Sequence, residues 1–507
     1  MSDSLENLFE KAFPFLILAV FLVFGCVGIL NHEMWRDELQ AWLIVKDSPD
    51  LKTVLQTIKF EGHPGLWYSL LYFLSKVSSN IVGFQLLHLA IAAVSIYVFV
   101  VFAPFSKFQK SLFAFGYFPL YEYSIISRHY AIGILFVFLL CALYPNRRKM
   151  YVVIGVILAL LANSNVYGSI IAICFYSMLI VDFFLQADRM KGEKLGAIAG
   201  SVAFMLGLAL AVEQMIPRSD SCFAVPWHFF FHATHFGATL STVAASYIPL
   251  PNIDSIDFWN SNFLAFSPAG EAFMPDISLV LAVCCLVSLY RTPLALWLYL
   301  SSTIGVLLFT YLVYFGSLRH HGHLFVILVV CFWIASYYEN STNLDPAESK
   351  VSWNQKTGKI FLTLLLCLHF VSGAFAFYTD LRHPFSAGQA VAEFIKEHGL
   401  QTAIVAGDGP YVTSVGAYLD KPVYFADRSR FGTFVVFDTQ LSRPDCPELM
   451  ERVKRVAQPL NADVILVLNE EISCQVPGTA ILRLMQITDT IVSDERAYVY
   501  LLKKNNK

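Results

Sequence analysis

Residues 31–68 read NHEMWRDELQAWLIVKDSPDLKTVLQTIKFEGHPGLWY, a polar and aromatic-rich stretch between one apolar segment and a long, very apolar region. The stretch contains two adjacent carboxylates, Asp37 and Glu38. Acidic groups are costly beside hydrocarbon, so in such a position they usually mark a reaction or transport site. The same pair could instead cap an interfacial helix whose apolar residues lie on lipid. This stretch alone leaves both interpretations open.

The chain as a whole is too apolar for a soluble globular protein. Of its 507 residues, 56% are hydrophobic and 14% are charged, and the mean hydropathy is +0.58. This composition predicts a polytopic α-helical membrane protein. The net charge is −3 and no long basic run occurs, so we expect no nucleic-acid partner.

Apolar runs long enough to span a bilayer, or nearly so, predict about eleven membrane helices. They lie at 13–30, 82–103, 111–124, 130–145, 150–164, 167–185, 195–216, 275–290, 293–315, 323–338 and 358–378. The N-terminal residues before the first run are mostly acidic, which is the wrong charge for a cleaved signal peptide. The first run is therefore predicted to be a retained span.

Basic residues assign sides to these spans. With the N-terminus in the cytoplasm, the loops rich in Lys and Arg all fall on the cytoplasmic side, as the positive-inside rule requires. These residues are Lys107, Lys110, Arg147, Arg148, Lys149, Arg189, Lys191, Lys194, Arg291, Lys350 and Lys356. The count holds only if the apolar piece 65–79, about 15 residues long, lies at the interface and does not cross. The prediction is a multi-pass protein of the plasma (inner) membrane whose outer face carries residues 31–80, 217–275 and everything after the last span.

A different composition begins after the last span. Helices are expected at 387–398, 411–419 and 447–457, and strands at 402–406, 422–425, 433–437, 463–468 and 496–502. The chain thus divides into a transmembrane module, 1–380, and a small extracytoplasmic α/β domain, 381–507. In an oxidising compartment, Cys446 and Cys474 could pair within this domain.

Two polar clusters, Ser127–Tyr130 and Arg319–His323, stand at the outer ends of predicted spans. Arg suits a phosphate because guanidinium offers a fork of donors and keeps its charge. A single Arg near a helix end also commonly snorkels to lipid headgroups without any ligand. Two such clusters on the face that carries Asp37 favour a site. Tyr167, at the same depth, suits sugar hydroxyls or helix packing.

The histidines of the second cluster raise the question of a metal, since imidazole with carboxylate is a common ligand set. No H-E-x-x-H or C-x-x-C motif accompanies them. No cofactor is therefore assigned, and a divalent cation is left open.

The chain resembles the GT-C superfamily of integral-membrane glycosyltransferases in its first apolar helix, the acidic pair that opens a large outer loop, the segment His63–Tyr68 and the Arg128–Tyr130 motif. The branch most similar to it contains the protein O-mannosyltransferases and lipid A aminoarabinose transferases (glycosyltransferase family 39-like). Members of this branch often carry His-Pro-Pro-Leu-Tyr, whereas here Gly65 replaces the second Pro and Trp67 precedes the Tyr. The resemblance covers residues 13–185 and implies a GT-C-like fold.

The resemblance implies an enzyme that moves a hexosyl or pentosyl group from a polyprenyl-phosphate donor to a hydroxyl of a lipid, glycan or protein acceptor. Following the family pattern, Asp37 is predicted to be the catalytic base, and Glu38 to position it or bind the acceptor. Base-assisted attack with departure of the phosphate from the other side would invert the anomeric configuration. Substrate contacts are predicted for Arg36, His63, Arg128, His129, Tyr130, Tyr167, Arg319 and His320.

Two other functional classes compete with this prediction. A transporter or flippase of a lipid-linked or small anionic substrate would use the acidic loop as a gate, and it predicts inverted repeats and charges at mid-membrane. Neither is evident in the sequence. A sensor whose spans only anchor the C-terminal domain would not need so many spans.

Overall fold

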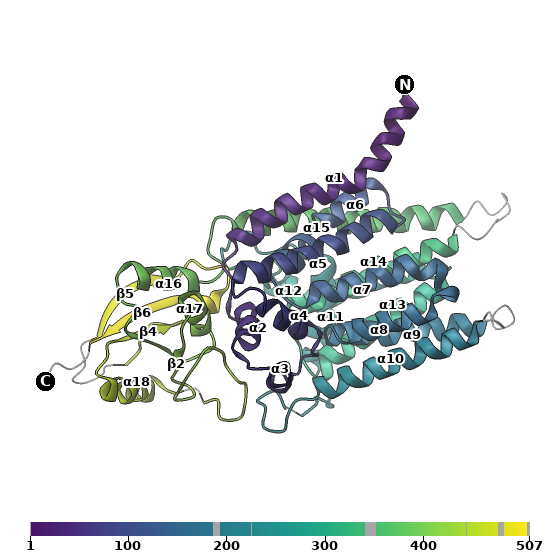
Figure 1. The fold of residues 1–507 in the computed structure, drawn as a ribbon. Helices are drawn as coiled ribbons and strands as arrows, with labels where there is room; N and C mark the ends of the chain where they lie inside the picture. The colour runs from purple at the N-terminus through teal and green to yellow at the C-terminus, as the bar shows by residue number, and fades with distance from the viewer. Residues whose placement is uncertain are drawn as a thin grey trace.

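The structure, a computed structural model, describes residues 2–185, 193–224, 226–339, 351–442, 444–474 and 481–503. A bundle of long helices carries a small α/β domain at one end, and the start of the chain lies at the other end (Figure 1). Three basic residues of the predicted loops, Arg189, Lys191 and Lys350, lie outside the described residues.

Nine helices in the described part of the chain are long and apolar enough to cross a membrane. They are α1 (Ser2–Asn31), α5 (Ile81–Phe102), α7 (Tyr130–Leu143, continued by η3, Tyr144–Lys149), α9 (Val166–Leu185), α10 (Lys194–Met215), α12 (Pro268–Leu289), α13 (Pro293–Leu312), α14 (Leu318–Glu339) and α15 (Val351–Asp380). The prediction of a polytopic α-helical membrane protein is confirmed.

The other two predicted spans take shorter forms within the bundle. Residues 111–124 are divided by Gly116 between α6 (Lys107–Ala114) and a π-helical segment, η2 (Tyr117–Ile125). Residues 150–164 become the 12-residue helix α8 (Tyr151–Ala162). This helix packs on α10 at Gly155, where an added Cβ would lie 2.1 Å from the backbone oxygen of Gly200. Such close helix contacts need small residues.

Four short elements cover the end of the bundle that carries the acidic pair, hereafter the motif end. They are α2 (Arg36–Asp47), α3 (Leu51–Thr57), η1 (Ile58–Phe60) and α4 (Leu66–Ser75) (Figure 1). At 1.5 Å per residue, α4 reaches only about 15 Å, half of a hydrocarbon core of about 30 Å. It is too short to cross a bilayer. Residues 217–275, predicted as a loop, also contain α11 (Ala233–Tyr247), which packs on α12 and α14.

The C-terminal domain is a six-stranded sheet of order β3-β2-β1-β4-β6-β5. Its strands are β1 (Ile404–Gly407), β2 (Val423–Phe425), β3 (Arg430–Gly432), β4 (Val464–Leu468), β5 (Ile481–Ile487) and β6 (Ala497–Leu502). β1 is parallel to β2 and β4, and the other pairs are antiparallel. The predicted strand at 433–437 is wrong: pairing with β2 ends at Gly432, and the backbone of Val435 bonds to the side chain of Gln40 instead.

Helices cover both faces of this sheet. Alternate residues of one strand point to opposite faces, so Val405 and Ile465 pack under α16 (Gly388–Glu397) and α17 (Val412–Leu419). Ala406 and Leu466 pack under α18 (Cys446–Leu460) on the other side. A disulfide joins Cys446 to Cys474, a pairing that the sequence left open. α17 also packs against α2 and so connects the domain to the motif end.

Candidate active site

Asp37 lies in the first turn of α2, and its carboxylate meets arginines from three parts of the chain. Its Oδ2 lies 2.9 Å from Nη1 of Arg128 and 3.3 Å from Nη2 of Arg319. Its Oδ1 lies 3.9 Å from Nε of Arg36. The Asp37 side chain is 32% exposed, whereas those of Arg128 and Arg319 are 11% exposed. The site is therefore a partly open carboxylate on a floor of two nearly buried cations.

Charge determines the ionisation of this carboxylate. Burial alone would raise the pKa of Asp37, but Arg128, Arg319 and Arg36 together lower it below its usual range. The reciprocal effect overcomes burial at Arg128 and raises the pKa of that guanidinium. Asp37 is thus an ionised carboxylate at neutral pH.

Two indole rings hold the Arg319 guanidinium in place. Its Cζ lies 5.1 Å from the ring centre of Trp35 and 5.1 Å from that of Trp259. Trp259 in turn donates from Nε1 to Glu122 at 3.1 Å, and Tyr117 donates its hydroxyl to the same carboxylate oxygen at 3.2 Å. Cation–π contacts are strongest where the cation is desolvated. The two rings therefore fix the cation without neutralising it.

Glu38 is fully buried and turned away from Asp37. Its Oε2 accepts from the backbone N–H of Trp35 at 3.2 Å, and its Oε1 accepts from the backbone N–H of Ser127. The imidazole of His32 bridges Glu38, at 3.1 Å, and Asp380, at 2.8 Å. The helix-cap interpretation thus applies to Glu38, whereas the Asp37 carboxylate is directed at the arginines.

Five of the predicted binding residues form a continuous series of ring contacts that runs from the motif end into the bundle. Ring centres lie 4.9 Å apart for His63 and His129, 4.3 Å for His129 and Tyr130, 5.7 Å for Tyr130 and His320, and 5.7 Å for His320 and Tyr167. Burial, followed by nearby Arg128, lowers the pKa of His63 to about 4. Burial likewise lowers the pKa of His129. At neutral pH these two imidazoles are uncharged hydrogen-bonding groups.

Not every predicted residue is available to a ligand. Arg36 donates to Glu495 at 2.8 Å and to Asp494 at 2.6 Å, both in the C-terminal domain. His320 accepts the backbone N–H of Ser317 at its Nδ1, 2.9 Å away. The Arg36 side chain therefore joins the motif to the C-terminal domain.

The described histidines are not arranged as a metal site. His321 donates to the backbone oxygen of Phe315 at 2.8 Å, and His323 donates to that of His320 at 2.9 Å. Within the described residues, no group of three or more His, Cys, Asp or Glu side chains could hold a metal ion.

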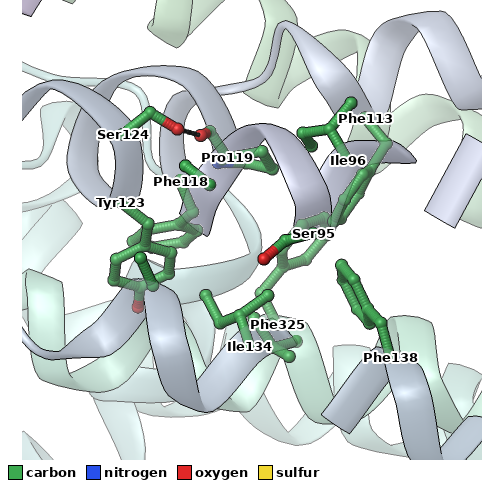
Figure 2. A pocket seen from close by; sticks show the side chains of 13 residues that line it. Ser95, Ile96, Phe113, Phe118, Pro119, Tyr123, Ser124, Ile134, Phe138 and Phe325 are labelled. Atoms are coloured by element: carbon green, nitrogen blue, oxygen red, sulfur yellow. Dashed lines mark hydrogen bonds between the residues drawn. The ribbon is translucent and has the colours of Figure 1, made fainter. Parts of the chain in front are cut away.

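Two cavities of very different size lie away from Asp37. One, of about 20 Å³, is lined by apolar side chains of α5, α6, η2, α7 and α14 and by the hydroxyl-bearing Ser95, Tyr123 and Ser124 (Figure 2). It has room for one water molecule. The other, of about 610 Å³, lies between α8, α9 and α10 and is lined by Phe184 and Lys194 at the far ends of α9 and α10. It is therefore at the opposite end of the bundle from the acidic motif.

Several residues that build the site were not predicted from the sequence. Glu122 carried a usable signal, since an acidic residue in an apolar segment marks a site by default. Glu61 stood within the quoted stretch; it accepts from Gln40 and from Tyr68, at 2.9 and 2.8 Å. Trp259 and Asp380 reach the site from more than 200 residues away, and no local pattern distinguishes them.

Comparison with known proteins shows similarity in structure alone. No protein-family model and no curated protein matches the sequence. Two solved structures of ArnT from Cupriavidus metallidurans match over nearly their whole length. The form bound to undecaprenyl phosphate is 11% identical, with 96% of this chain and 97% of ArnT covered and a TM-score of 0.50. The apo form is 11% identical, with 97% and 98% covered and a TM-score of 0.53. The chain shares the ArnT fold. The GT-C-like fold expected from residues 13–185 is confirmed and extends over nearly the whole chain, the C-terminal domain included.

Proposed function

We propose that this protein is a membrane glycosyltransferase that moves a sugar from a polyprenyl-phosphate donor to an acceptor hydroxyl. The contact of one ionised carboxylate, Asp37, with two nearly buried arginines carries this proposal. Such a site brings together a base for a hydroxyl and cations for a phosphate. The ArnT fold supports it, because an ArnT of this fold was crystallised with undecaprenyl phosphate.

The proposed reaction is a single displacement at the anomeric carbon. Asp37 takes the proton from the acceptor hydroxyl as that oxygen bonds to the anomeric carbon. The bond from that carbon to the phosphate oxygen breaks, and the polyprenyl phosphate leaves with the electron pair. Arg128 and Arg319 stabilise the negative charge that develops on it. Attack and departure on opposite faces invert the configuration.

The proposed orientation places the motif end and the C-terminal domain outside the cytoplasmic membrane and the N-terminus inside. Basic residues support it, since Lys107 pairs with Glu10 early in α1, and Arg147 pairs with Asp182 near the end of α9, both far from the motif. The disulfide between Cys446 and Cys474 supports it too, because disulfides persist in oxidising compartments. The working division is a transmembrane module, 1–380, and an extracytoplasmic domain, 381–507.

Donor cleavage by the purified protein tests the function. With a lipid extract as the source of acceptor, a polyprenyl-phosphate sugar should yield free polyprenyl phosphate and a glycosylated product, both measured by mass spectrometry. A nucleotide sugar should yield neither. A transporter would bind the lipid and leave the glycosidic bond intact, so binding without cleavage across a panel of pentosyl and hexosyl donors would contradict the proposal.

A further inference from the structure

The acidic helix α2 is held by the C-terminal domain at its first residue. Arg36 donates to Glu495 at 2.8 Å and to Asp494 at 2.6 Å. The Glu495 side chain is only 1% exposed, and its other oxygen accepts from the Ser386 hydroxyl at 2.7 Å. A buried ion pair with this many partners is costly to break from one side, because the remaining charge stays desolvated.

One turn further along, a second contact ties the same helix to the same domain. Gln40 accepts from the backbone N–H of Val435 at 3.0 Å and donates to the backbone oxygen of that residue at 2.5 Å. Both residues are buried. The Gln40 amide thus replaces the strand that would otherwise continue from β3, and it also donates to Glu61 at 2.9 Å.

These two contacts share one face of α2. Residues four apart are neighbours on a helix surface, so Arg36 and Gln40 face the C-terminal domain together. Asp37, between them, is directed at the arginines of the bundle. The domain also contacts the chain two residues before α2 begins, since the backbone N–H of Met34 donates to the Tyr418 hydroxyl at 2.9 Å. The bundle supplies the two cations, and the C-terminal domain holds the helix that carries the carboxylate.

We propose that the C-terminal domain is a positioning part of the active site, which holds α2 so that Asp37 stays within reach of Arg128 and Arg319. This inference rests on the proposed transfer function. Misplacing a catalytic group by about 1 Å can cost on the order of 10²-fold in rate. Arg36 released from Glu495 would turn to Asp37, which is already 3.9 Å away, and draw that carboxylate from its place.

The test compares two contacts between α2 and the domain. Glu495→Gln weakens the buried contact. Asp420→Asn removes the negative charge that pairs with Lys46. The Asp420 side chain is 80% exposed, and such exposed ion pairs contribute little. We expect Glu495→Gln to speed hydrogen exchange in residues 36–47 and to lower kcat about tenfold or more with KM within about twofold, because the cations for the donor remain in place. Asp420→Asn should match the parent in all three measurements.

Asp494→Asn is the second variant, to be measured if Glu495→Gln does not fold. Asp494 is 56% exposed, so its replacement leaves the domain core intact. It should show the same changes in smaller size. Unchanged exchange in α2, or faster exchange with unchanged kcat, would overturn the positioning role. Hydrogen exchange does not depend on turnover, so a parent that exchanges slowly at α2 but transfers no sugar would refute the proposed function separately.

Discussion

At the scale of single residues, the proposed function implies that Asp37 and a donor phosphate would compete for the same guanidinium N–H groups. In the free protein Arg128 and Arg319 both lie on Oδ2 of Asp37, and they keep its pKa low. A carboxylate stabilised in this way is a weak base. A phosphate that takes over part of the two guanidinium groups removes part of that stabilisation and raises the basicity of Asp37. Donor binding would therefore activate the base that the acceptor needs.

Replacing either arginine with lysine tests this sharing. Arg128→Lys and Arg319→Lys keep the charge but lose the fork of donors, and we expect turnover to fall on the order of 10-fold to 100-fold while the protein folds normally. Arg218→Lys is the matched control, because Arg218 is 49% exposed and its ion-pair partner, Asp220, lies only two residues along the chain. Steady-state kinetics and donor titration measure both effects. If a lysine variant has the turnover and the donor affinity of the parent, that arginine does not bind the phosphate and its role is structural.

At the scale of elements, a buried imidazole joins the end of α1, the start of α2 and the end of α15. Burial alone would lower the pKa of His32, but Asp380 and Glu38 overcome it and raise the pKa to about 10. The unfolded value is about 6.5. Folding therefore favours the protonated ring, so this contribution to stability is complete below about pH 6.5 and disappears as the pH rises to about 10.

His32→Gln should remove this pH dependence. We expect the parent to lose thermal stability between about pH 6.5 and 10, and the variant to be less stable at neutral pH with a flatter profile over that range. His398→Gln, at an exposed position of the C-terminal domain, should follow the parent. Melting temperatures in one detergent across this pH range decide the matter. Parallel profiles for parent and His32→Gln would show that protonation of His32 is not linked to folding.

At the scale of the whole molecule, the sequence predicted what depends on local pattern and missed what depends on long-range packing. Long apolar runs predicted the membrane bundle, and a short continuous apolar run, VILVL, predicted the buried strand β4. β5 lies at the edge of the sheet with much of its surface exposed, so its residues carry no clear alternation. The predicted strand at 433–437 does not form, because the backbone of Val435 bonds to Gln40. These two residues are nearly 400 positions apart in the sequence, so no local pattern could predict the contact. In the site, Asp37, Arg128 and Arg319 were predicted because they stand in local motifs. Trp259 and Asp380 were not predicted, because only the folded chain brings them to the site.

The proposed orientation makes a prediction at this same scale. Single cysteines at Ser79, Lys503 and Lys149 of a cysteine-free variant report the side on which each residue lies. Ser79 follows α4 at the motif end, and Lys503 follows β6 in the C-terminal domain. An impermeant thiol reagent applied to intact cells should label both. Lys149, in a basic turn at the opposite end of the bundle, should react only after the membrane is opened. Protection of Ser79 or Lys503 in intact cells would overturn the orientation.

The rate of sugar transfer by Asp37→Asn decides whether Asp37 is the catalytic base. Asn keeps the size of the side chain but cannot accept the proton, so turnover should fall on the order of 10² to 10⁴-fold. Binding of undecaprenyl phosphate should persist or tighten, because the two arginines lose their competing carboxylate. Asp50→Asn is the control, since Asp50 caps α3 through the backbone N–H of Thr53 and Asn caps a helix about as well. A folded Asp37→Asn protein that transfers sugar at the parental rate would contradict the assignment of Asp37 as the base.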